Sequence, residues 1–242
     1  KLLLVTKANT TSTVHRRAYM DYIGVKRFGE NGEVVGELRI VGLFTFTAYT
    51  QSAVRIPLLR AKIADVTRRF GYEPKSHAGR MLQNILESYP RDELFQAPVP
   101  LLADFCEQIM AIADRPRIRV LSRIDNFDRF VSALVYVPRN LYDSRLREKI
   151  GDYLASVYKG RVSAYYPSFP EGRSARVHFI IGRRSLDKTP DVPQSELEAE
   201  VTRLAADWTE RFKELTGPGA PEIEANDAYH EAFSPDDAYA DL

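Results

Sequence analysis

The sequence predicts an α+β protein in which antiparallel sheets carry helices packed on one face. Three patterns in its 242 residues predict this fold class. Residues 2–50 and 117–182 are rich in strand-like segments, apolar residues recur at helical spacing between and after them, and short polar turns join neighbouring strands. Such two-layer frames serve binding and regulation more often than one diagnostic chemistry, so function has to be argued from particular residues.

Residues 117–182 contain the clearest succession of elements. Apolar and polar residues alternate over 118–124, and Phe130–Val137 is an almost unbroken β-favouring run, typical of a central strand covered on both faces. The short polar connection Asn126–Asp128 predicts an antiparallel hairpin between these two strands. Because one helix layer covers only one face of a sheet, the run Phe130–Val137 also predicts either self-association or coverage by a later helix of the chain.

A helix and two further strands complete this module. Asp143 offers a helix cap, an apolar stripe at helical spacing follows, and Gly160 predicts the end of the helix. The stripe consists of Leu146, Ile150, Leu154 and Val157. Strands are expected at Val162–Tyr166 and 177–181, with a polar turn at 167–172 between them, and the helix should lie on the sheet.

The first fifty residues predict a curved antiparallel sheet. Leu2–Thr6 indicates a short strand, Asn9–Thr13 a polar turn, and Val14–Phe28 a long strand. Gly29–Gly32 is a strong hairpin turn because its Asn-Gly pair accepts positive φ angles, and Glu33–Tyr49 should return as one or two strands.

Helices are expected next, over 57–70, 77–89 and 101–110, each with an apolar stripe. The prolines around Pro98 suggest a domain boundary, which divides the chain into segments 1–98, 99–184 and 185–242. In the last segment a linker precedes Ser195, which forms a predicted capping box with Glu198 and starts one long amphipathic helix to Gly217. That helix covers either its own sheet or a neighbouring chain, and an acidic tail with weak helical patches follows it.

Composition limits the cellular setting and the partners. The single Cys and the absence of an apolar run of about 18 residues argue against a disulfide framework and a membrane span, so a cytoplasmic setting is expected. Because Lys1 is neither an initiator Met nor the start of a signal peptide, we expect a longer parent chain.

The net charge of +1 combines an acidic tail, with seven acidic residues and no Lys or Arg over 217–242, and a body of 34 basic against 26 acidic residues. The basic residues are scattered over strands and helices, which indicates solvated faces rather than nucleic-acid binding. They include Arg16, Arg39, Arg60, Arg68, Arg119 and Arg147.

The sequence offers no strong catalytic or metal-binding pattern. His15, His77, His178 and His230 are isolated from one another and from Cys106, so no metal ligands are assigned. His178 is expected to face outward from its strand, and Cys106 to be a buried, inert thiol. No phosphate-binding glycine loop or nucleophile elbow is present, so no catalytic or cofactor-binding residue is assigned.

Two carboxylate pairs have structural explanations. Asp125 with Asp128 falls in a turn, and Asp236 with Asp237 in the acidic tail. The polar segment Thr6–Arg17 is the one stretch whose density of functional side chains exceeds that of an ordinary turn. A hydrogen-bonded structural loop is the favoured interpretation of this segment, and the alternative is a catalytic cluster of an independent enzyme.

Several segments resemble the N-terminal half of the large bacterial NAD-specific glutamate dehydrogenases. The resemblance begins at Thr6, runs to Lys26, and covers nearly the whole chain. Its other segments are Gly42–Thr45, Ile56–Arg60, Asn84–Phe95, Asp128–Ser132, Val135–Arg139, Ala175–Phe179 and Glu231–Pro235. The resemblance implies PAS-like character for residues 1–98, an ACT-like, ferredoxin-like module at 99–184, and oxidative deamination of L-glutamate with NAD by the catalytic domain of the parent.

In that interpretation this region is non-catalytic, binds no cofactor itself, and contributes to regulation and homo-oligomer formation beside the rest of the parent chain. An amino-acid effector is a further implied partner, while nucleic acid and membrane are not. ACT modules bind amino acids where a glycine lets the backbone approach, but the connection Pro138–Asp143 has no glycine, so no binding residue is assigned. A free-standing amino-acid sensor remains the alternative function.

Overall fold

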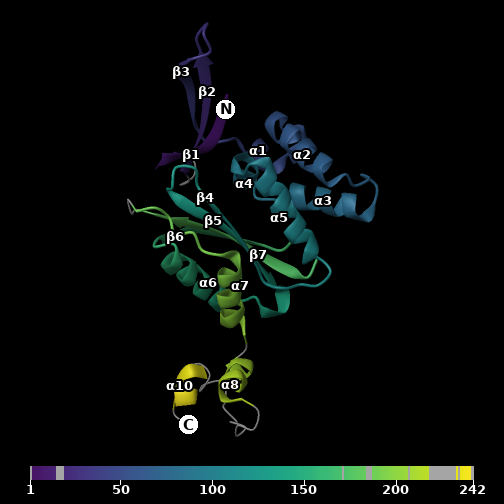
Figure 1. The fold of residues 1–242 in the computed structure, drawn as a ribbon, viewed down its shortest axis with the longest axis vertical. Helices are drawn as coiled ribbons and strands as arrows, with labels where there is room; N and C mark the ends of the chain where they lie inside the picture. The colour runs from purple at the N-terminus through teal and green to yellow at the C-terminus, as the bar shows by residue number, and fades with distance from the viewer. Residues whose placement is uncertain are drawn as a thin grey trace. The chain divides into compact units, whose positions relative to one another are not determined.

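The computed structural model describes residues 2–14, 19–170, 172–183, 187–206, 208–217, 233 and 235–240. It confirms the α+β class: the described residues form a three-stranded and a four-stranded antiparallel sheet together with several helices (Figure 1). The chain divides into two compact units, residues 1–111 and 112–242, which we describe separately. No helix among the described residues is long and apolar enough to cross a membrane.

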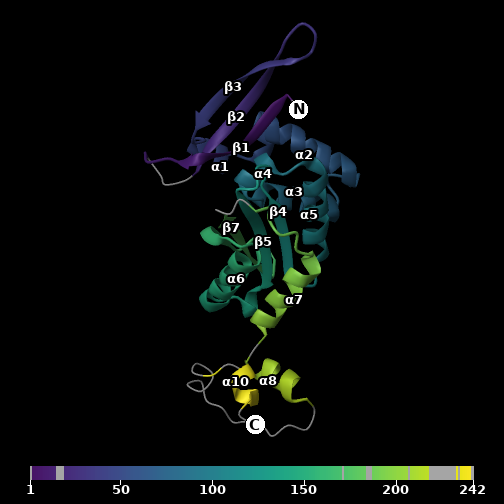
Figure 2. The ribbon, with the colours of Figure 1, turned by 60° about the vertical axis from the view of Figure 1, so that its left-hand side comes forward.

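The first unit begins with the sheet β1 (Leu3–Thr11), β2 (Tyr19–Phe28) and β3 (Val34–Gly42), in that spatial order. Figure 2 shows the three strands side by side, with β1 and β3 at the edges. The predicted hairpin turn is confirmed, because Gly32 has a φ of 80° and Gly29 N donates to Glu33 O over 2.9 Å.

Two expectations for these strands are wrong. The turn expected at Asn9–Thr13 is largely strand, because β1 continues to Thr11 and pairs there with Tyr19 after a register shift beyond Lys7. The expected return strand at Glu33–Tyr49 ends at Gly42, and Phe46–Thr50 forms the short helix α1. Pairing with β2 keeps the polar end of β1 in the strand up to Thr11. Among the described residues, the segment after Gly42 has no strand beside it to pair with, so it does not continue the sheet.

Helices form the rest of the first unit. They are η1 (Ala53–Arg55), α2 (Pro57–Phe70), α3 (His77–Ser88), α4 (Arg91–Gln96) and α5 (Val99–Ala111). Pro57 occupies the first turn of α2, and Gly71 ends that helix with a left-handed φ of 63°. The sequence did not indicate α4, a single short helix between two prolines. Because α5 packs on α2 and α3, the compact unit extends to Ala111, beyond the composition break at Pro98.

The second unit contains the expected succession of strands and helix. It comprises β4 (Arg119–Ile124), β5 (Phe130–Pro138), η2 (Arg139–Leu141), α6 (Ser144–Val157), β6 (Arg161–Ser168) and β7 (Ser174–Gly182). The spatial order is β4-β5-β7-β6 and every neighbouring pair is antiparallel, which confirms both the hairpin and the central position of β5.

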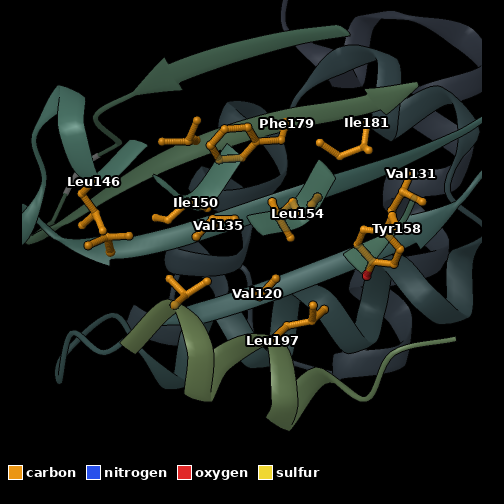
Figure 3. Close-up of a cluster of buried hydrophobic side chains, with 14 residues drawn as sticks. Val120, Val131, Val135, Leu146, Ile150, Leu154, Tyr158, Phe179, Ile181 and Leu197 are labelled. Atoms are coloured by element: carbon orange, nitrogen blue, oxygen red, sulfur yellow. The ribbon is translucent and has the colours of Figure 1, made fainter. Parts of the chain in front are cut away.

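One face of this sheet forms a core with α6 and α7 (Gln194–Ala205). Figure 3 shows Val135 and Phe179 from the sheet converging with Ile150 and Leu154 from α6 and Leu197 from α7. Helix α7 therefore covers the sheet of its own chain, which was one of the two predicted alternatives, the other being a neighbouring chain. All residues from Val131 to Val137 are buried in the single chain, so β5 offers no exposed surface for the predicted self-association.

The prediction of one long helix from Ser195 to Gly217 is wrong in two respects. It is divided into α7 and α8 (Trp208–Thr216), because the backbone at Ala206 is extended, with ψ near 137°. The capping box is also absent: Pro193 precedes α7, and Glu198 points to β4 instead. In the described part of the tail, α10 (Pro235–Ala240) packs on α8.

The end of α6 also differs from the expectation. Lys159, not Gly160, takes the left-handed conformation, with a φ of 50°. Gly160 is required for a different reason, since a Cβ there would lie 2.8 Å from Gly182 O. Close approach to β7 therefore explains this glycine.

Candidate functional site

The polar segment near the N-terminus forms a charge network with the helices of its own unit. Lys7 Nζ lies 2.6 Å from Asp21 Oδ1 and 3.0 Å from Asp92 Oδ1. Asp21 also accepts a 2.8 Å hydrogen bond from Phe44 N, and Tyr49 donates to Asp92 over 3.1 Å. The network thereby ties β1 and β2 to α1 and α4.

The charge state of Lys7 argues against catalysis by this network. Burial lowers the pKa of its ammonium, but the carboxylates of Asp92 and Asp21 outweigh burial and raise that pKa above its ordinary value. A nucleophilic or basic lysine needs the opposite shift. Of the remaining cluster, Thr10, Thr13 and Val14 are exposed, and 15–18 lie outside the described residues. Lys7 therefore has a structural role, but it lies in strand β1 and not in the loop that was the favoured interpretation of this segment.

A second polar centre joins the start of the helical region to α3. Glu87 accepts hydrogen bonds from Ser52 Oγ at 2.5 Å and Ala53 N at 3.0 Å. Arg91 Nη2 lies 3.4 Å from the same carboxylate and donates to Gln51 O over 2.9 Å. Burial acts to raise the pKa of Glu87, but these hydrogen bonds and Arg91 outweigh it, so the pKa lies below its ordinary value.

Glu87 also lines a cavity of about 150 Å³ in this unit. The other lining residues are mainly apolar: Val54, Ile63, Thr67, Tyr72, Pro74, Gly79, Gln83 and Leu86. Since both oxygens of Glu87 are already hydrogen-bonded, the cavity has no free charged group to select a ligand.

The connection Pro138–Asp143, in which the sequence indicates no amino-acid-binding residue, is held by contacts within the chain. Asp143 Oδ1 accepts a 2.6 Å hydrogen bond from Leu146 N and so caps the N-terminus of α6. Arg139 Nη2 donates to Pro170 O over 2.7 Å, and the rings of Tyr142 and Phe169 meet edge to face. A ligand carboxylate at this helix terminus would have to displace Asp143.

His178 does not face outward, contrary to the expectation. It is 5% exposed, and its Nε2 lies 2.8 Å from Ser132 Oγ. The expectation failed because alternation along a strand shows which residues share a face, but not whether that face meets solvent. Among the described residues no group of three potential ligands could hold a metal ion, and His15 and His230 lie outside them.

The pair Asp125 and Asp128 acts in the hairpin turn. Asp125 accepts a hydrogen bond from Phe127 N and a two-pronged contact from Arg129, at 2.6 and 3.0 Å. Asp128, with a φ of 57°, accepts hydrogen bonds from Thr189 and pairs with the buried Arg183 at 3.3 Å. The hydrogen bond from the Thr189 hydroxyl, with further help from Arg183, lowers the pKa of Asp128. Asp125 acts within the turn, as expected, and Asp128 also connects the turn to Thr189 in the linker, which the sequence did not indicate.

Cys106 lies on the buried side of α5 and is fully covered. Burial raises the pKa of its thiol to about 12, so little thiolate is present near neutral pH. The polar groups around Lys7, Glu87 and Asp128 thus join elements of the fold, and the sequence predicts no catalytic, cofactor-binding or metal-binding residue to place among them.

Comparison with known proteins supplies the functional context. Residues 56–115 match the family described as glutamate dehydrogenase, helical motif 1, and residues 119–209 match glutamate dehydrogenase, ACT2 domain. The first match covers α2 to α5, and the second covers the sheet β4–β7 with α6 and α7. The PAS-like character expected for residues 1–98 is not part of either match and stays a prediction.

Similar full-length proteins carry the name NAD-specific glutamate dehydrogenase. The protein from Pseudomonas aeruginosa is 35% identical over 252 residues, covering 100% of this chain and 16% of the relative. Those from Halomonas elongata and Mycobacterium tuberculosis are 34% and 25% identical, covering 93% and 100% of this chain and 14% and 16% of the relatives. The chain, which spans about 16% of the length of such relatives, therefore belongs to the NAD-specific glutamate dehydrogenase family and contains its helical motif 1 and ACT2 domain.

Proposed function

We propose that this chain is a non-catalytic regulatory and assembly region of an NAD-specific glutamate dehydrogenase. The observation that carries the proposal is the match of the whole chain to relatives that have this name. The match covers 16% of the length of the relative from Pseudomonas aeruginosa. The parent would oxidatively deaminate L-glutamate to 2-oxoglutarate and ammonium and pass the hydride to NAD in a separate catalytic domain. Its setting would be cytoplasmic, and its partners the rest of the parent chain and further copies of itself.

The polar centres support a structural role for this region. Lys7 is held protonated between two carboxylates, Cys106 is covered, and Glu87 is engaged by backbone and side-chain donors. The Lys7 and Glu87 contacts each join separate elements, and the burial of Cys106 keeps its thiol away from any substrate. Such internal contacts suit a region that transmits regulation or assembly, because they fix its elements relative to one another.

A free amino-acid sensor receives less support. Asp143 of the chain already accepts the hydrogen bond at the N-terminus of α6, and the loop Pro138–Asp143 is packed against Pro170 and Phe169. Calorimetric titration with L-glutamate and other amino acids should therefore give no saturable heat. Saturable binding that is lost in a variant of the Pro138–Asp143 loop would favour the sensor instead.

The catalytic part of the proposal is tested with L-glutamate and NAD. The purified 242-residue chain should form no NADH above a buffer blank, since hydride transfer needs a cofactor fold that we place in another domain. In the natural full-length protein, deleting this region should change the oligomeric mass or the glutamate saturation curve and leave turnover measurable. NADH formation by the isolated chain, or complete loss of turnover in a deletion protein of unchanged fold and mass, would overturn the proposal.

A further inference from the structure

The edge strand β3 exposes apolar side chains over its whole length. Leu38 and Ile40 are 57% and 55% exposed, and Val34, Val35 and Val41 are similarly open. Within the described sheet β3 lies at the edge, beside β2 (Figure 2). One row of its backbone N–H and C=O groups therefore faces outward. An exposed apolar edge of this kind is a template for pairing with another strand.

The edges of the other sheet show how this protein protects a strand. On β4 the carboxylate of Glu198 accepts a hydrogen bond from Val120 N, and β6 contains Pro167, which donates no backbone hydrogen bond. Strand β3 has no proline and no lysine, and its pairing with β2 shifts register between Gly36 and Val34, which leaves Val35 as a bulge near the start of the strand. Proline and lysine, two of the devices that normally prevent edge pairing, are therefore missing from β3, and the bulge at Val35 leaves the pairing of Gly36–Gly42 with β2 regular.

We propose that β3 is a dimerisation strand, pairing antiparallel with β3 of a second copy of this chain about a two-fold axis at Leu38. Leu38 is the central residue of Val34–Gly42, so this register pairs all nine residues. It places Glu37 opposite the partner's Arg39, and Arg39 opposite the partner's Glu37. Opposite charges directly across an antiparallel pair stabilise it, and a two-fold axis makes each such contact twice.

Charge selects this register over its neighbours. An axis at Glu37 would place two glutamates opposite each other, and an axis at Arg39 would do the same with two arginines, both of which are unfavourable. The carboxylate is also held in position, since Glu37 accepts a 2.8 Å hydrogen bond from Tyr22 OH and lies 3.1 Å from Arg39 of its own chain. Pairing would join the Glu37–Arg39 ion pair of each copy into one network of four charges.

The apolar residues favour the same arrangement. The two-fold axis places Leu38 opposite the partner's Leu38, and Val35 opposite the partner's Val41. Leu38 and Ile40 share a face with Val25 and Ile23, their partners on β2, so that pairing produces a six-stranded sheet with one continuous apolar face. The biological meaning of this pairing rests on the assembly role proposed above. The pairing itself can be measured without any enzymatic activity.

A cysteine at the proposed axis tests the pairing directly. Residues opposite each other in an antiparallel pair have Cα atoms about 4.5–5.5 Å apart, which suits a disulfide. The Leu38→Cys chain should therefore form a covalent dimer of twice 27.5 kDa under mild oxidation, detected by non-reducing electrophoresis. The native Cys106 is buried and should contribute no background.

Matched cysteine variants test the register. Val35→Cys alone should not cross-link, because the two positions lie six residues apart along the pair, or about 20 Å. A mixture of Val35→Cys and Val41→Cys chains should cross-link into a heterodimer. Equal cross-linking of Leu38→Cys and Val35→Cys would overturn the proposed register.

Charge reversal provides an independent test without covalent capture. By light scattering, Glu37→Arg and Arg39→Glu should each lose the dimer, whereas the double variant should recover it, since opposite charges again meet. Circular dichroism confirms that each variant remains folded. A monomeric wild-type chain at tens of micromolar, or a natural full-length Leu38→Cys protein that fails to cross-link, would overturn the proposal and indicate that another segment or partner covers β3.

Discussion

Glu198 on α7 holds the edge strand β4 through Arg119. The Glu198 carboxylate receives hydrogen bonds from Arg119 Nη1 at 3.0 and 3.2 Å and from Val120 N at 3.2 Å. Gln194, one turn earlier on the same helix, donates to it over 2.7 Å. This contact joins residues 78 and 79 positions apart in the sequence and seats α7 on the sheet.

Replacing Glu198 with Ala should destabilise the second unit by about 2 kcal/mol, because it leaves the partly buried Arg119 without its carboxylate. The free energy of unfolding is measured by urea denaturation followed by circular dichroism. Glu196→Ala is the matched control, since Glu196 is exposed on the same helix and should cost well under about 1 kcal/mol. Equal losses in the two variants would contradict the role given to Glu198.

Lys62 should be a strong stabilising residue of the first unit. Its ammonium donates to the carbonyls of Leu94, Phe95 and Ala97, each over 2.8 Å, at the C-terminal end of α4. Lys62→Met keeps most of the side-chain volume but removes all three donors, and we expect a loss of about 2–4 kcal/mol in urea denaturation. The exposed Lys75→Met serves as the control, and a similar loss there would argue against the carbonyl contacts as the cause.

Glu87 predicts a pH dependence of stability. Its folded-state pKa is lowered below the ordinary value of 4.5, so the ionised carboxylate stabilises the fold above about pH 4.5, and this contribution is lost as the pH falls through the folded pKa. The stability difference between wild type and Glu87→Gln should be constant near neutral pH and narrow in acid. Thermal unfolding from pH 7 to pH 3 measures it, with Glu107→Gln on α5 as the exposed control. A stability difference between wild type and Glu87→Gln that grows in acid would contradict the lowered pKa of Glu87.

The end of α6 predicts opposite effects at adjacent positions. Gly160→Ala should destabilise by about 1–3 kcal/mol, because the added methyl group meets Gly182 O and Ile181 Cγ2, both at 2.8 Å. Lys159→Gly should be neutral or stabilising by up to about 1 kcal/mol, since Lys159 has a φ of 50°. Thermal denaturation of both variants measures these effects, and the reverse order of stabilities would contradict the roles given to Lys159 and Gly160.

Local patterns in the sequence determined the ACT-like part of the fold. The alternation over 118–124, the apolar run Phe130–Val137 and the short connection Asn126–Asp128 predict a hairpin whose second strand is central, and the structure has that hairpin. The stripe Leu146 to Val157 likewise predicts α6. These features follow from side-chain periodicity and turn chemistry, which act between residues close together in the chain.

Tertiary contacts decided what the sequence left open or suggested wrongly. Glu198 satisfies an ordinary capping-box pattern, yet it is used by Arg119 because packing of α7 brings β4 within reach. His178 has the alternation of an outward residue, yet it is buried beside Ser132 because only the assembled fold determines whether a face meets solvent. Lys7 lies in the segment Thr6–Arg17, whose favoured interpretation was a hydrogen-bonded loop, but pairing with β2 and the approach of Asp92 place it in a strand and a charge network. In each case the deciding partner lies far along the chain, where periodicity carries no information.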